Sequence, residues 1–231
     1  MSQHITMGAG LTAPQNTFAA TERAGTPSVA RRLLAATAAA APMLFTAYVA
    51  TNPAPLPREP AADFLGAIAA HPTAFVVSTT LQLAAAATGL VFAAYVMIAF
   101  ARSAPRLAPV VGVLLGVSYV AVAAFAGAKL VAADLIVDGA LRAGSLEVWS
   151  AVHTGPFFDV LDWPILMAIP ANLLLAVLLL RNRRTVGAWS AAAVFVGFVM
   201  GSGEFPDVVT ILGWAIQIPV VLHVVRRTFR G

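Results

Sequence analysis

The stretch that decides the fold is APVVGVLLGVSYVAVAAFAGAKLVAA, residues 108–133, in which a single residue is charged. A helix rises about 1.5 Å per residue, so this stretch is longer than the ~30 Å hydrocarbon core of a bilayer. Arg102 and Arg106 precede it, and Asp134 and Asp138 follow it. The pattern predicts a transmembrane helix with a basic end and an acidic end.

The composition of the whole chain is that of a polytopic membrane protein. Of its 231 residues, 60% are hydrophobic and 10% are charged, and the mean hydropathy is +0.86. A soluble domain has roughly 25% charged residues. The chain has no cysteine, which excludes disulfides, thiolate metal sites, iron–sulfur clusters and cysteine nucleophiles. No cofactor is predicted.

Hydropathy divides the chain into a tail and an all-α bundle of six transmembrane spans. Residues 1–28 are small and polar, which is typical of a disordered cytoplasmic tail. Residues 29–231 form the membrane domain. Within it, residues 61–70 place Phe64, Leu65 and Ile68 on one side of a short helix that we expect to lie at the membrane interface. The six expected spans cover residues 33–51, 73–101, 108–133, 156–180, 186–201 and 208–225.

The charges set the expected orientation. With six spans, only Arg58 and Arg142 of the arginines fall in the loops opposite the termini, and only Glu22 of the ten acidic residues falls on the side of the termini. Basic residues are retained on the cytoplasmic side, so we expect both termini to be cytoplasmic. The pI of about 10.3 therefore reflects membrane topology, and no nucleic-acid partner is expected. The Ala-, Arg- and Pro-rich composition indicates the cytoplasmic (inner) membrane of a high-GC bacterium.

Acidic residues on the outer side form the first candidate site. Asp159 and Asp162 are three residues apart near the start of the fourth span, Glu204 and Asp207 open the sixth in the same way, and His153 is nearby. One interpretation is that these carboxylates stabilise helix N-termini. The other is a ligand or cation site, because carboxylates with histidine bind divalent metals. No ligand spacing specifies a metal.

Four polar residues lie within the expected spans. Lys129 is near the outer end of the third span, where it is expected to snorkel or to pair with Asp134 or with a carboxylate of another helix. Gln82, Asn172 and Gln217 are expected to form interhelical hydrogen bonds. Alternatively, together with prolines in the spans, they line a cavity between kinked helices.

Two glycine pairs have the spacing of close helix contacts. They are Gly112-x-x-x-Gly116 in the third span and Gly197-x-x-x-Gly201 in the fifth. Small residues four apart allow helix backbones to approach in membranes. In an Ala-rich chain such pairs also arise by chance.

Three segments resemble an uncharacterised bacterial multi-pass membrane family, the domain of unknown function 4386 type. The segments are AADFLGAIAAHP, YVMIAFARSAPRLAPVVGVLLG and SLEVWSAVHTGPFFDVLDWPILM. The resemblance covers residues 33–227 and rests on the order of features and on hydropathy. It implies a multi-pass helical fold and brings no activity and no catalytic residue.

The residues favour a non-enzymatic integral membrane protein, an accessory or small-ligand-binding component of the lipid bilayer. A membrane-protein partner or a homo-oligomer fits this interpretation. The alternative is a transporter-like protein for a cation or cationic solute, using Asp159, Asp162 and Glu204, with Lys129 as a further candidate. A membrane hydrolase is least supported, because spacing specifies no acid–base pair.

Overall fold

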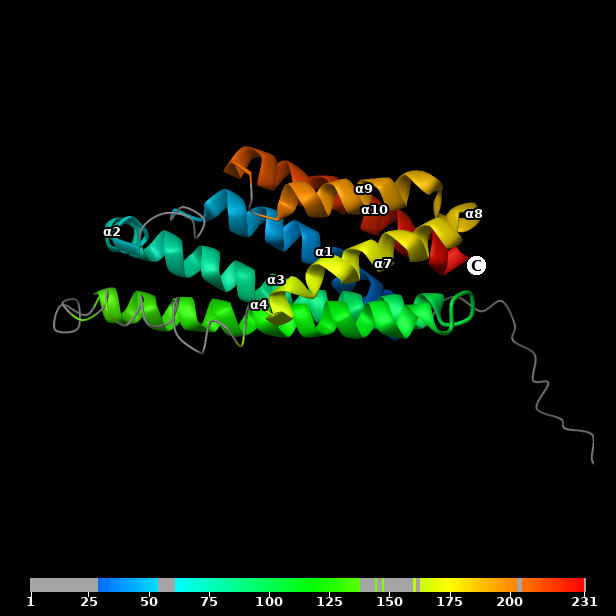
Figure 1. The fold of residues 1–231 in the computed structure, drawn as a ribbon, viewed down its shortest axis with the longest axis horizontal. Coiled ribbons are helices and arrows are strands. Elements are labelled where there is room, and N and C mark those ends of the chain that lie inside the picture. The colour runs from blue at the N-terminus through cyan, green and yellow to red at the C-terminus, as the bar shows by residue number, and fades with distance from the viewer. Residues whose placement is uncertain are drawn as a thin grey trace, which may run out of the picture.

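The computed structural model describes residues 29–53, 61–137, 144, 147, 160, 163–202 and 205–230. The expected tail, residues 1–28, lies outside this part of the chain. The described elements are eight helices (Figure 1). Their bounds are α1 Val29–Thr51, α2 Ala61–Ala70, α3 Pro72–Phe100, α4 Leu107–Val137, α7 Ala168–Arg181, α8 Arg183–Val186, α9 Ala188–Gly201 and α10 Asp207–Arg230.

Six of these helices pack as a closed ring. Each of α1, α3, α4, α7, α9 and α10 contacts two neighbours, in the order α1–α3–α4–α7–α9–α10 and back to α1. Figure 1 shows α4 along one long side of the bundle and α9 with α10 along the other. Consecutive helices are neighbours wherever short connections join them, as in up-and-down bundles.

The largest hydrophobic core draws on every helix of the ring. Its buried members include Ala38, Val96, Val111, Leu178, Val194 and Val220, one from each helix. Large apolar side chains also cover the outside, among them Val113 at 58% exposure and Val120 at 56%. A helix that is apolar all round is typical of a membrane span. The multi-pass helical architecture predicted from the composition is therefore confirmed.

Five described helices are long and apolar enough to cross a bilayer. They are Arg32–Thr51, Pro72–Phe100, Leu107–Ile136, Trp163–Arg181 and Asp207–Thr228. The expected fifth span, residues 186–201, is instead the 14-residue helix α9, about 21 Å long. It begins after Gly187, whose φ of 78° is a conformation that favours glycine. This backbone turn separates α8 from α9 and shortens the apolar helix.

The expected short helix is present, and its apolar face is as predicted. Phe64, Leu65 and Ile68 of α2 are buried. They pack against Phe75 of α3 and Ile136 of α4, and the rings of Phe64 and Phe75 meet edge to face with centroids 5.8 Å apart. The helix therefore directs this face onto the ends of α3 and α4 and not toward lipid.

Candidate functional site

Lys129 lies at the centre of a polar cluster between three helices. Its side chain is 5% exposed. The Nζ atom donates hydrogen bonds to Tyr48 Oη on α1, at 3.0 Å, and to Gln82 Oε1 on α3, at 3.2 Å. Both partners are themselves buried. One ammonium group thus joins α1, α3 and α4.

Aromatic rings complete the surroundings of this ammonium group. Nζ lies 4.9 Å from the centroid of the Phe125 ring and 5.3 Å from that of Tyr48. At such distances a cation is attracted by the negative face of the ring. Thr79, one turn from Gln82 on α3, is fully buried, and its hydroxyl has no hydrogen-bond partner within the described part of the chain.

The structure gives Lys129 partners other than the expected ones. The side chain is buried and does not snorkel, and the hydrogen-bond partners that the described residues supply are neutral. Asp134 is exposed on the same helix. Five residues along an α-helix correspond to a rotation of roughly 140°, so Asp134 and Lys129 lie on different faces of α4. Of the expected polar residues, Gln82 is the one that the structure brings to Lys129.

Tyr48 and Phe125 were missed in the sequence. Phe125 precedes Lys129 by four residues, a spacing that places two side chains on one helix face, so a local signal for it existed. Tyr48 is 81 residues away from Lys129. Only the packing of α1 against α3 brings it near, and no local pattern records that contact.

The outer acidic candidate lies mostly outside the described residues. This applies to Asp159, Asp162, Glu204 and His153. Asp207 is the first residue of α10 and is exposed, a position in which a carboxylate interacts favourably with a helix N-terminus. Within the described ranges, no three His, Asp or Glu side chains gather as metal ligands.

Asn172 and Gln217 are buried in helix packing. Asn172 Nδ2 donates to the Ala168 carbonyl oxygen of its own helix at 2.8 Å. Gln217 packs against Gly197 of α9, where an added Cβ would lie 2.8 Å from Gln217 Cγ. The Gln217 amide nitrogen finds no hydrogen-bond partner among the residues that the structure describes. Each side chain therefore contributes to contacts within or between helices.

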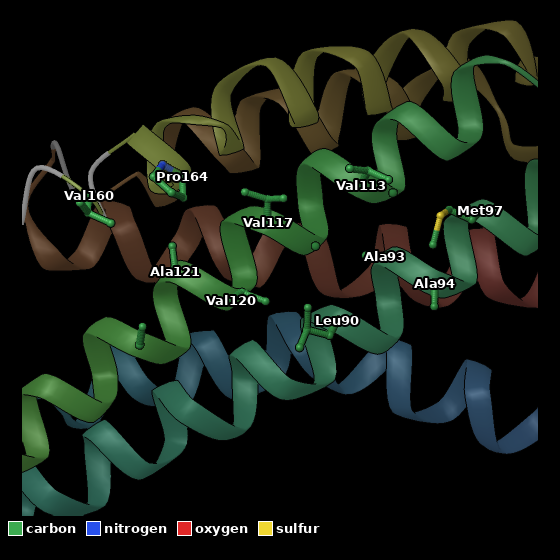
Figure 2. Close-up of a pocket in the computed structure, with 13 residues that line it drawn as sticks. Leu90, Ala93, Ala94, Met97, Val113, Val117, Val120, Ala121, Val160 and Pro164 are labelled. Carbon is green, nitrogen blue, oxygen red and sulfur yellow. The ribbon is translucent and has the colours of Figure 1, made fainter. Parts of the chain in front are cut away.

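An apolar groove runs between α3 and α4 (Figure 2). Its volume is about 540 Å³. Ala94 and Met97 line it from α3, and Val117 lines it from α4. Val160 and Pro164 lie at one end in Figure 2. Every lining residue is apolar, and Val117 is 42% exposed, so the groove opens on the outer surface of the bundle.

Comparison of the chain with protein-family models, with curated proteins and with solved structures finds no match. The fold and the two features described above, the lysine cluster and the groove, therefore carry the functional argument. Together they define the class: a multi-pass integral membrane protein.

Proposed function

We propose that this protein is a non-enzymatic accessory component of the bacterial cytoplasmic membrane that binds a small apolar ligand in the groove between α3 and α4. The observation that carries the proposal is the groove itself. Its lining is apolar and it opens on a surface that faces lipid in a membrane-spanning bundle. Pockets with such linings hold ligands by burial of apolar area.

The proposal includes six spans with both termini in the cytoplasm. Helix α9 supports this number because it is a full member of the ring, in contact with α7 and α10. A helix of about 21 Å is accommodated by local thinning of the bilayer or by burial among longer neighbours. The resemblance to the uncharacterised family remains part of the proposal, supported by the order of a short helix followed by two long spans.

The groove's surroundings favour entry of the ligand from the bilayer. Val113, Val117 and Val120 are each more than 40% exposed on the same side of α4. A ligand that reaches the groove sideways never leaves the hydrocarbon region, so its apolar surface stays out of water. Binding then depends on shape and contact area within the groove, because lipid competes with equal hydrophobicity.

The test compares ligand retention in two matched variants by native mass spectrometry of protein released from membranes. Ala94→Phe fills the groove, whereas Ala87→Phe adds the same side chain at an exposed position of α3 that does not line it. We expect the wild type and Ala87→Phe to retain a bound small molecule or lipid and Ala94→Phe to lose it. Equal retention in all three proteins would contradict the proposal.

A further inference from the structure

We infer that the ligand of the α3–α4 groove is an anionic phospholipid of the inner leaflet, with one acyl chain in the groove and its phosphate at the turn that joins the two helices. This inference rests on the proposed function and names its ligand. It is carried by the length and lining of the groove and by the charge at one of its ends.

The groove has the dimensions of a lipid chain. Along α4 it extends from Gly112 to Ala124, a distance of about 18 Å at 1.5 Å per residue. This is somewhat more than the ~15 Å depth of one leaflet, half of a ~30 Å hydrocarbon core. Small side chains keep the floor open, and the space in front of Gly116 holds no side chain within 4 Å of the position of a Cβ.

Positive charge stands at the end of the groove near the α3–α4 turn. Met97 lines that end three residues before α3 finishes at Phe100. The turn that follows, residues 101–106, has the sequence ARSAPR. Its two arginines, Arg102 and Arg106, are exposed, as is the serine between them. Guanidinium groups form strong hydrogen bonds with phosphate.

The direction of α4 adds to this charge. The helix begins at Leu107, directly after the turn, so the positive end of its macrodipole lies beside the two arginines. The proposed topology places the same turn at the cytoplasmic surface, where bacterial inner leaflets present anionic headgroups to basic juxtamembrane residues. The positions proposed for the acyl chain and for the headgroup therefore fit a single lipid molecule.

The charged end favours lipid over a partner helix as the occupant. A helix from another chain would satisfy the apolar part of the groove equally well, but its own cytoplasmic end is expected to carry basic residues, which Arg102 and Arg106 would repel. An anionic lipid places opposite charges together at that end.

The experiment measures lipid binding to the full chain by native mass spectrometry, with phosphatidylglycerol and phosphatidylcholine of identical acyl chains added in detergent. We expect the wild type to bind phosphatidylglycerol more tightly, and Arg102→Gln/Arg106→Gln to weaken that binding roughly tenfold. Arg226→Gln/Arg227→Gln is the matched control. It removes two exposed arginines from α10, a helix that contributes no lining residue to the groove, and should leave the preference intact.

The two proposals fail in distinguishable ways. If both lipids bind equally and Ala94→Phe abolishes the binding of both, the groove binds acyl chains and the proposed selectivity for an anionic headgroup is wrong. If Ala94→Phe binds both lipids like the wild type, the groove is not the site and both proposals are wrong. A dimer that excludes lipid, and that Ala94→Phe dissociates, would replace the lipid with a second copy of the chain.

Discussion

At the scale of single residues, Lys129 is the one charged side chain that is buried in the described part of the bundle. A charged group inside a membrane is costly, and it is tolerated where other groups of the protein satisfy it. Here two neutral oxygens and two aromatic rings surround the ammonium group. Since no carboxylate is among these partners, the stability of the cluster depends on hydrogen bonds that the neutral residues Tyr48 and Gln82 accept.

This dependence predicts that Lys129 and Gln82 are energetically coupled. Gln82→Leu removes an acceptor from the buried ammonium group and should lower stability by about 1–3 kcal/mol. In a Lys129→Met background the same change should cost less, with a coupling energy of about 1 kcal/mol. The measurement is a double-mutant cycle from thermal or denaturant unfolding in detergent.

A control for this cycle exists on the same helix. Thr80 is exposed, and its hydroxyl donates to the Val76 carbonyl oxygen of its own helix. Thr80→Val should therefore be additive with Lys129→Met. Additivity of Gln82→Leu with Lys129→Met within about 0.5 kcal/mol would show that the hydrogen bond between the two side chains contributes no stability.

At the scale of helices, the sequence predicted which helices form and which faces they bury. It predicted less well where a helix begins and which side chains meet between helices. The long spans and the buried face of α2 follow from hydropathy and from a 3.6-residue period, both of which are local. The start of α9 depends on one glycine, Gly187, whose positive φ the pattern of apolar residues does not reveal. The partners of Lys129 depend on the register of α1 against α3, which no single helix encodes.

The close contact between α9 and α10 depends on glycines, which have no side chain to keep the two backbones apart. A Cβ on Gly213 would collide with the backbone of Gly201 and Met200, and a Cβ on Gly197 would lie 2.8 Å from the carbonyl oxygen of Gly213. The predicted spacing Gly197-x-x-x-Gly201 thus marks a true helix contact. Both glycines of the other pair line the groove between α3 and α4, where Gly112 packs against the Met97 side chain and Gly116 has open space in front of it.

We predict that Gly213→Ala separates α9 from α10 and lowers stability by about 1–3 kcal/mol, because backbone atoms cannot move aside as a flexible side chain can. Gly127→Ala is the matched control. It lies in α4 with nothing within 4 Å of the added Cβ, and it should be neutral or stabilising by up to about 1 kcal/mol. The readout is the unfolding midpoint of each variant in the same detergent, and equal midpoints would contradict the close contact.

At the scale of the whole molecule, the number of crossings decides where the termini lie. Among the described helices, five have the length of a span, and α9 is shorter. If α9 crosses, both termini share a side. If it does not cross, they are on opposite sides, and the arginines after α7 and those at the end of α10 are separated by the membrane. The positive-inside rule favours the first arrangement, because it collects both groups in the cytoplasm.

The absence of cysteine from the sequence makes this testable by single-cysteine labelling. Thr51, Ser103, Thr185 and Ser202 are exposed positions at successive ends of the helices. We expect Thr51→Cys and Ser202→Cys to react with a membrane-impermeant maleimide in intact cells, and Ser103→Cys and Thr185→Cys to react only in inverted vesicles.

The decisive pair is Thr185 and Ser202, which bracket α9. Labelling of both from the same side would mean that α9 does not cross, and the chain would then have five spans. Labelling of Ser103 and Thr185 only in inverted vesicles, with Ser202 labelled in intact cells, would place the turn with Arg102 and Arg106 at the inner leaflet, as the phospholipid site requires.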